Sequence, residues 1–429
     1  MEHINYISKE AKTSRSGYVW YCMFEYFIAI LATDAFLAKL LKNIGMSDSL
    51  TGIISSFVSL AFLFQLLSIF ILKRKINAKA LCITFESISQ LCFVFLYIVP
   101  FLPVSSEFKS ILVVVAIMVA YALKYVVSSI LFRWANSYVD PMHRGSFSAV
   151  KEIISLAGGM VFSFVMGVVT DKFFEYGNEV GAFIFIAVSV FVLTVINFVC
   201  LSKVKNCNIN TAQSAKVPMK TLLEKTLFNK KFLPVIIATS LYSFGTYITA
   251  GFLGVYKTKD LLISLSVVSI IGGVASATRM LVSKPFGRYS DKKSYAKAME
   301  LGYFIIAVGF LSIVFTVPDT WWLMFIYSAL SGIGSAGANA NTSNIVYSYV
   351  EADFISQAMA FRSSISGVVG FLGALVGAKI MDIIQANGNM VFGIYMYPQQ
   401  LMAFISFVCI MLSVAIIHFV IAKTKVIVQ

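Results

Sequence analysis

The sequence contains little charge and almost no histidine. Charged residues make up 13% of the 429 residues, against about 25% in soluble domains. The three histidines, His3, His143 and His418, stand far apart, which argues against a histidine-based metal site or catalytic triad. No GxSxG, HExxH or Walker A sequence occurs, so the usual signatures of hydrolases, metalloproteases and P-loop proteins are missing. We therefore expect no enzymatic activity and no metal or other cofactor.

Other apparent motifs carry no chemistry. The six cysteines have no CxxC spacing and stand mostly inside apolar runs, as expected for small hydrophobic residues that stay reduced. Gly332-Ile333-Gly334-Ser335-Ala336-Gly337 satisfies GxGxxG, but no strand is predicted before it, and close helix packing explains it better. Residues 1–17 are polar, and the apolar run after them has no small-residue cleavage site, so we expect no secretory signal.

Long apolar runs dominate the chain. Apolar residues make up 59% of it, against roughly 45–50% in soluble domains. Backbone polar groups in lipid must be satisfied within a segment, which predicts helices, and no stretch shows the alternation of a β-barrel. The sequence therefore predicts an all-α membrane protein with twelve transmembrane helices, at about 20 residues each. The runs are 18–42, 50–72, 80–99, 108–131, 150–171, 181–201, 233–256, 262–283, 299–317, 321–346, 360–381 and 400–422.

The distribution of basic residues predicts the orientation. Lysine and arginine gather in both terminal segments and in alternate loops, whereas the other loops hold only five lysines: Lys42, Lys109, Lys172, Lys257 and Lys259. The positive-inside rule then places both termini in the cytoplasm. Topology and anionic lipid explain the net charge of +14, so we expect a multi-pass protein of the cytoplasmic membrane that does not bind nucleic acid.

Part of the sequence occurs twice. Ser137-Tyr138-Val139-Asp140 returns as Ser348-Tyr349-Val350-Glu351, and at the same offset Lys151 matches Arg362. Asp171 matches Asp382 in the same way. A repeat of about half a chain indicates two homologous halves. The predicted organisation is a six-helix bundle at 1–201, a basic cytoplasmic linker at 202–232 and a second six-helix bundle at 233–429.

The predicted architecture resembles the major facilitator superfamily. The most specific match is Gly287 to Lys297, which follows the family pattern of a glycine, an acid four residues later and then basic residues. The first-half copy, Ser68 to Lys79, has lost the glycine and the acid. The resemblance implies a gating role for Gly287 and Asp291, because glycine permits close backbone approach and the acid favours a helix N-terminus or a partner such as Lys151. Gating is also expected of Arg362, the repeat counterpart of Lys151.

Ionisable residues inside the spans are the first functional candidates, because they are costly in a membrane. Glu25 and Asp34 lie in the first span, about 180° apart around a helix, and Lys124 lies in the fourth at a depth similar to that of Glu25. In the superfamily these spans line the central cavity, so the resemblance makes Glu25 and Lys124 partners in a charge switch, in which protonation of the acid frees the base. The alternative is a structural pair, or a Lys124 that extends to the membrane interface.

Polar side chains in several spans are candidates for binding a solute. They are Tyr21, Tyr242, Thr246, Thr249, Arg279, Asn339 and Asn341. Arg279 lies on a stripe of small residues, which indicates a close-packed or cavity-facing surface. The same polar groups equally suit hydrogen bonds between helices.

These observations predict a secondary active transporter that works by alternating access around a site near the midplane. The chain has no nucleotide-binding sequence, so an ion gradient is the expected driving force, and the carboxylates favour the proton. We expect a monomer that takes up a small polar solute such as a sugar or glycoside. Efflux of amphipathic compounds is the alternative, although span five lacks the glycine–proline signature of exporters. A membrane sensor or membrane-embedded enzyme is the alternative of a different class.

Overall fold

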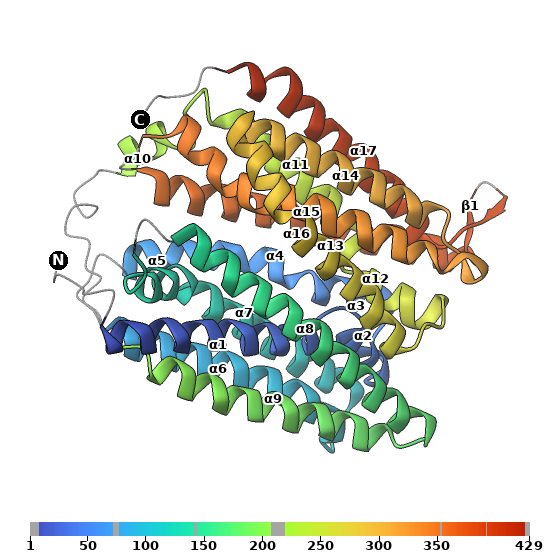
Figure 1. Cartoon of the computed structure of the whole chain (residues 1–429). Coiled ribbons are helices and arrows are strands. Elements are labelled where there is room, and N and C mark those ends of the chain that lie inside the picture. The colour runs from blue at the N-terminus through green and yellow to red at the C-terminus, as the bar shows by residue number, and fades with distance from the viewer. Residues whose placement is uncertain are drawn as a thin grey trace. The chain divides into compact units, whose positions relative to one another are not determined.

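The structure is a computed structural model, and it describes residues 8–71, 77–140, 144–206, 219–351, 354–391 and 393–424 (Figure 1). The helices up to residue 202 are α1 Lys9–Leu31, α2 Asp34–Asn43, α3 Asp48–Ser55, α4 Phe57–Ala61, η1 Phe62–Phe64, α5 Gln65–Ile71, α6 Ala78–Ile98, η2 Val99–Phe101, α7 Ser106–Asn136, α8 Arg144–Glu175 and α9 Glu179–Ser202.

A second group of elements begins at residue 219. Its helices are α10 Met219–Lys225, α11 Leu233–Ala250, α12 Leu253–Val255, the π-helical turn η5 Tyr256–Asp260, α13 Leu265–Lys292, α14 Tyr295–Val314, η6 Pro318–Thr320, α15 Leu323–Tyr349, α16 Ile355–Ala386, α17 Pro398–Phe419 and η8 Ile421–Lys423. Strands β1 Met390–Val391 and β2 Ile394–Tyr395 form a small antiparallel hairpin.

Helical elements occupy each of the twelve predicted spans. Ten helices in the described ranges are long and apolar enough to cross a membrane. The first span departs from the expectation of one continuous helix, because α1 ends at Leu31 and α2 begins at Asp34. Asp34 has a φ of 50°, a left-handed conformation that aspartate tolerates better than most residues and that a helix does not accommodate.

The chain divides into two compact units. The first comprises residues 1–46, 64–215 and 264–269, and the second comprises 47–63, 216–263 and 270–429. Residues 47–63 belong to the second unit because α3 and α4, which they form, pack against α16. The predicted boundaries at 201 and 233 stay a prediction.

Packing within each unit follows from the apolar helix faces. In the first unit α6 lies against α7 and α9, and α1 lies against α8 and α9 (Figure 1). In the second unit α14 packs on α15 and α17, and α11 packs on α16 and α17. The contact between α14 and α15 depends on glycine, because a Cβ on Gly302 would lie 2.7 Å from the Gly334 carbonyl oxygen. The expectation that the GxGxxG sequence serves close helix packing is confirmed.

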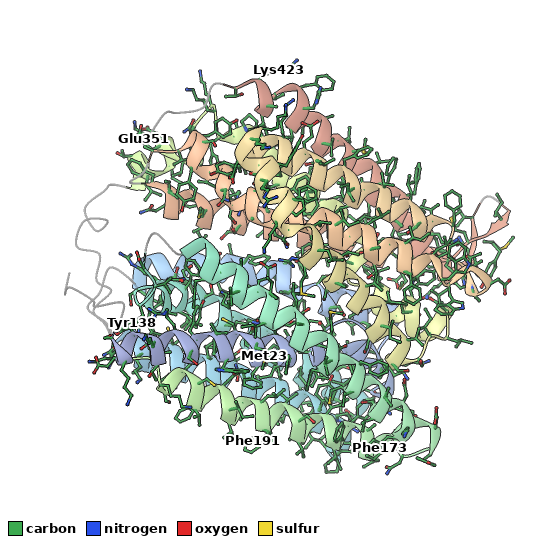
Figure 2. All side chains as sticks on the ribbon, in the orientation of Figure 1. Met23, Tyr138, Phe173, Phe191, Glu351 and Lys423 are labelled. Atoms are coloured by element: carbon green, nitrogen blue, oxygen red, sulfur yellow. The ribbon has the colours of Figure 1, made fainter. Side chains whose placement is uncertain are left out.

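The outward face of α9 is apolar. Phe191 projects away from the neighbouring helices (Figure 2), and it is 49% exposed. Other exposed apolar side chains continue along the same helix: Val188, Val192, Val195 and Phe198. Such a face suits contact with lipid chains, which are as apolar as the side chains themselves.

Candidate functional site

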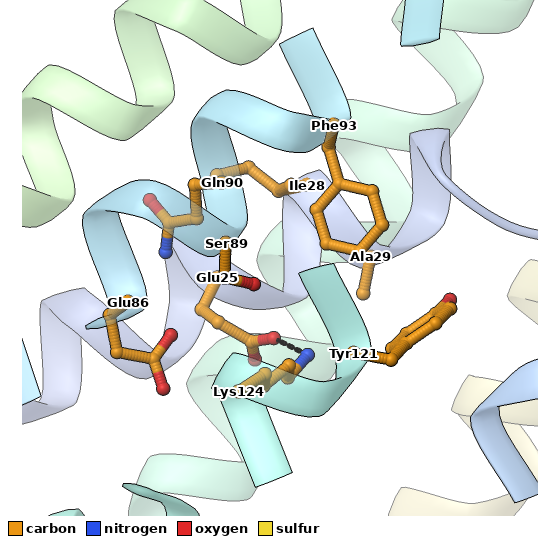
Figure 3. A pocket seen from close by; sticks show the side chains of 9 residues that line it. All are labelled: Glu25, Ile28, Ala29, Glu86, Ser89, Gln90, Phe93, Tyr121 and Lys124. Carbon is orange, nitrogen blue, oxygen red and sulfur yellow. Dashed lines mark hydrogen bonds and ion pairs between the residues drawn. The ribbon is translucent and has the colours of Figure 1, made fainter. Parts of the chain in front are cut away.

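An ion pair joins two helices inside the first unit. Glu25 on α1 accepts a hydrogen bond from the ammonium group of Lys124 on α7 (Figure 3). Each side chain is 24% exposed. The structure thus brings together the two residues that depth and the family resemblance suggested as partners, and the Lys124 amino group is directed to Glu25 instead of to a membrane interface.

A second carboxylate, Glu86 on α6, lies beside this pair. Its side chain is 3% exposed, and its Oε2 atom has no hydrogen-bond partner in the described part of the chain. The sequence analysis missed Glu86, although it is an ionisable residue inside a predicted span, the same criterion that selected Glu25. The cluster therefore holds two acids and one base, an arrangement that depth arguments on single helices did not reveal.

These three groups share a small pocket. Its other lining residues come from the same three helices: Ile28, Ala29, Ser89, Gln90, Phe93 and Tyr121. Ser89 donates to the Ala120 carbonyl at 2.8 Å, whereas the Gln90 Nε2 atom is buried without a hydrogen-bond partner among the described residues. Buried polar atoms are nearly always satisfied in proteins, so each exception needs a physical explanation. Here the two unsatisfied residues, Glu86 and Gln90, both line the same pocket.

The remaining candidates of the first unit lie elsewhere. Asp34 is exposed at the start of α2 and does not line this pocket. Tyr21 is buried and stacks on Tyr18 with ring centroids 6.4 Å apart. The Lys151 ammonium on α8 lies 4.9 Å from the centre of the Tyr18 ring, which is a cation–π contact. Roles for these residues in coupling, binding and gating stay predictions.

Three binding candidates on α11 have different surroundings. Tyr242 stacks face to face on Tyr303 of α14, with centroids 3.9 Å apart and planes 8° from parallel. Thr246 is close to the Tyr242 side chain, but its buried hydroxyl makes no hydrogen bond of good geometry with any described residue. Thr249 is 2.7 Å from the Ser406 hydroxyl of α17. That contact is the helix–helix hydrogen bond left open as an alternative.

The binding candidates on α13 and α15 also have different surroundings. Asn341 accepts a hydrogen bond from Ser290 at 2.5 Å and donates to the Gly337 carbonyl at 2.7 Å, so it joins the two helices. Asn339 is exposed, and Arg279 is partly buried. Asn341 therefore has a packing role.

The gating candidates on α13 are exposed. Gly287 and Asp291 lie in the last turns of this helix, and a Cβ on Gly287 would meet no described atom within 4 Å. The gating roles of Gly287 and Asp291 stay predictions. Arg362 on α16 is buried.

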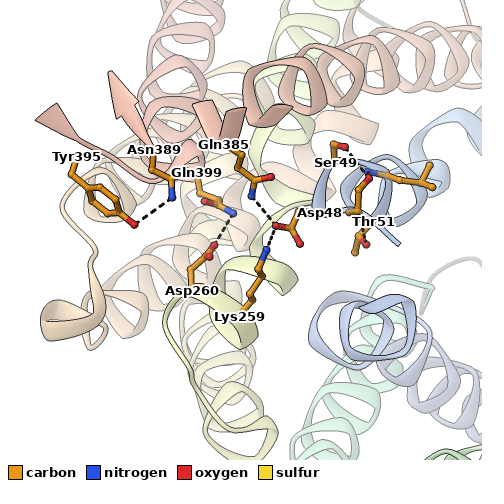
Figure 4. A network of polar contacts seen from close by, with 11 residues as sticks. Asp48, Ser49, Thr51, Lys259, Asp260, Gln385, Asn389, Tyr395 and Gln399 are labelled. Carbon is orange, nitrogen blue, oxygen red and sulfur yellow. Dashed lines mark hydrogen bonds and ion pairs between the residues drawn. The ribbon is translucent and has the colours of Figure 1, made fainter. Parts of the chain in front are cut away.

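A polar network in the second unit was not foreseen. Asp48 at the start of α3 pairs with Lys259 and accepts a hydrogen bond from Gln385 of α16 at 2.7 Å (Figure 4). Nearby, Gln399 donates to Asp260 at 3.3 Å. Because Asp48 and Lys259 stand more than two hundred positions apart in the chain, no local sequence signal predicts their contact.

The carboxylate of Asp171 binds the end of a helix within the first unit. The two carboxylate oxygens of Asp171 on α8 accept hydrogen bonds from the backbone N–H groups of Leu265 and Ser266 at 3.0 and 2.8 Å. Lys39 lies 4.0 Å from the same carboxylate. An anion at the N-terminal end of a helix satisfies unpaired N–H groups and complements the helix dipole.

Comparison with known proteins gives one family match and several structural likenesses. Residues 235–426 match the model of the Major Facilitator Superfamily. A mutant form of the nucleoside transporter NupG has a TM-score of 0.71 at 13% identity, over 95% of this chain and 98% of that chain. An auto-inhibited POT family peptide transporter has a TM-score of 0.71 at 11% identity, over 98% of each chain. A bacterial homolog of the human lysosomal transporter Spinster reaches 0.67 at 14% identity, over 97% of each.

These structural likenesses show the fold, and they extend over nearly the whole chain. No curated protein sequence matches significantly. The family match covers the Gly287 to Lys297 segment from which the resemblance was first inferred. The chain is a multi-pass integral membrane protein with the fold of the major facilitator superfamily, and its residues 235–426 match the model of that family.

Proposed function

We propose that this transporter is a proton-coupled secondary active transporter that takes up a small polar solute, such as a sugar or glycoside, and that Glu25, Glu86 and Lys124 form its proton site. The observation that carries the proposal is the pocket in which two carboxylates face one ammonium. This arrangement has one acid in excess.

Charge balance gives the excess acid a function. With all three groups ionised the cluster carries one net negative charge, and with one bound proton it is neutral. An ionised side chain at the centre of a membrane helix costs about 2.5–3.5 kcal/mol, so a buried cluster of this composition favours the protonated form. Lys124 already compensates Glu25, which makes Glu86 the carboxylate that takes up and releases the proton.

Proton release then acts on the ion pair. A deprotonated Glu86 competes with Glu25 for Lys124, so the ammonium is drawn toward α6 and the bond between α1 and α7 weakens. Tyr21 on α1 and Cys82 on α6 also face Glu86, but neither supplies a compensating positive charge. Protonation is thereby linked to the packing of three helices, which is the link that alternating access requires.

The class of solute rests on separate observations. The structural neighbours include transporters of nucleosides and peptides, which are small polar molecules. In this chain the stacked Tyr242–Tyr303 pair and the Thr246 hydroxyl offer an aromatic surface with hydrogen-bonding groups. Asn339 and Arg279 are further candidates for contact with the solute in the second unit.

The test uses purified protein in proteoliposomes. A thermal-shift screen with sugars, nucleosides and dipeptides first identifies a ligand, and its uptake is then measured with and without an inward proton gradient. Glu86→Gln is expected to abolish gradient-driven accumulation while solute exchange continues, because a neutral side chain mimics the protonated state. Glu107→Gln, at an exposed position at the start of α7, is the matched control. Intact accumulation in both Glu86→Gln and Glu25→Gln would rule out the proposed proton site.

A further inference from the structure

Arg362 is a buried cation in the second unit. Its side chain is 8% exposed, and its Nη2 atom donates a hydrogen bond of 3.3 Å to Ser363. The Nε atom has no hydrogen-bond partner, and no carboxylate in the described ranges forms an ion pair with the guanidinium. Its electrostatic neighbour is the hydroxyl of Tyr303.

This situation differs from that of Glu86. A buried carboxylate loses its charge by binding a proton, whereas arginine stays charged at any physiological pH. Burying a cation without a counter-ion costs several kcal/mol, and buried arginines are accordingly almost always paired. A counter-ion for Arg362 that is not part of the described chain explains why the residue is tolerated at this position.

The surroundings of Arg362 suit a small ligand. The Tyr303 hydroxyl is 3.1 Å from the hydroxyl of Thr342 on α15, and the Tyr303 ring stacks on Tyr242 of α11. Gln357, on the same helix as Arg362, has a buried Oε1 atom without a hydrogen-bond partner among the described residues. The cluster therefore combines a planar cation, hydroxyl donors from two further helices and an aromatic face.

We infer that Arg362 binds an oxyanion of the transported solute, so that the cargo is a small polar molecule with a carboxylate or phosphate group. A guanidinium donates two parallel hydrogen bonds to either group. The tyrosine pair covers the less polar part of the same molecule.

The inference rests on the proposed proton-coupled transport and gives it a physical reason. A membrane potential that is negative inside opposes the entry of an anion. One proton carried with one negative charge makes the transport step electroneutral and removes this opposition. Glu86 in the first unit and Arg362 in the second thus act in the same transport cycle.

The experiment measures equilibrium binding in detergent, with no ion gradient. The probes are matched pairs that differ only in the anionic group: galacturonate and galactose, uridine monophosphate and uridine, and dialanine and its amide. Wild-type protein is expected to bind the acidic member of one pair, and Arg362→Gln to bind it about 10- to 100-fold more weakly. Arg362→Lys keeps the positive charge but lacks the two parallel N–H donors of the guanidinium. Its affinity for the acidic probe should therefore lie between those of wild type and Arg362→Gln. Arg288→Gln, at an exposed position on α13, should bind like wild type.

The melting temperature without ligand provides the second measurement. Removing an uncompensated buried charge should leave the melting temperature of Arg362→Gln unchanged or raise it, whereas a structural ion pair predicts a clear decrease. Equal binding of acidic and neutral probes, or a lowered melting temperature in Arg362→Gln, would overturn the inference. If neutral probes alone bind while a proton gradient still drives their uptake, the inference fails and the proposed function stands. If acidic probes bind but no gradient drives their uptake, the proposed function fails while Arg362 remains an anion site.

Discussion

Asp171 accepts a backbone hydrogen bond from Leu265 at 3.0 Å, so a carboxylate on α8 caps the N-terminus of α13. Its second oxygen accepts from the next N–H group, that of Ser266, at 2.8 Å. The repeat counterpart Asp382 is exposed on α16. Two residues at equivalent positions of a duplicated sequence therefore have different surroundings.

Removing this cap should destabilise the protein. Asp171→Ala is expected to lower the free energy of unfolding by about 1–2 kcal/mol, because two helix N–H groups lose their acceptor and the dipole loses its anion. Asp171→Asn keeps one acceptor and should lose less. Chemical unfolding in detergent measures both, with Asp382→Asn as the control. Equal stability of Asp171→Ala and the control would show that water replaces the carboxylate without cost.

In the ion pair of the first unit, removing the second charge should restore part of the stability that is lost when the first is removed. Lys124→Met leaves two carboxylates near each other without a cation, and breaking a buried pair costs about 3–5 kcal/mol. Adding Glu25→Gln removes one of those charges, so the double variant is expected to be more stable than Lys124→Met alone. Melting temperatures of the two single variants and the double variant measure this coupling. Losses that simply add would mean that the two side chains are energetically independent.

The two asparagines of α15 should separate packing from solute binding. Asn341→Ala leaves the Ser290 hydroxyl without its acceptor and should cost about 0.6 kcal/mol and at most about 1.7 kcal/mol, as for other hydrogen bonds between membrane helices. Asn339 is exposed, so Asn339→Ala should leave the melting temperature unchanged. Its effect on the ligand-induced thermal shift then tests its predicted role in binding. A loss of stability in Asn339→Ala would instead assign that side chain to packing.

Gly287 offers a test of gating that does not disturb the fold. A larger side chain meets no described atom within 4 Å in this structure, so Gly287→Leu should fold with an unchanged melting temperature. If another conformation brings a helix against this face during transport, the same variant should transport more slowly, and Asp291→Asn should do so as well. Initial transport rates at saturating solute provide the measurement. Wild-type rates in both variants would limit the segment to a topology signal.

The sequence by itself determined the helices and indicated the fold. Lipid leaves a chain few ways to satisfy its backbone, so apolar runs became helices where they were expected, from α6 near residues 80–99 to α17 near 400–422. Depth can also be counted along a helix at about 1.5 Å per residue, so similar depth together with the family resemblance predicts the contact between Glu25 and Lys124 that the structure shows.

Only the tertiary structure decided which groups share a site. The position of a side chain around a helix axis matters as much as its depth, and that position depends on how several helices pack. Glu86 joined Glu25 and Lys124 because α6 lies between α7 and α9 with this residue turned toward the pocket. Packing likewise left Arg362 buried without an ion-pair partner among the described residues and gave Asp171 a helix terminus to cap. Spacing along one chain contains no information about these contacts, because each one joins helices that are distant in sequence.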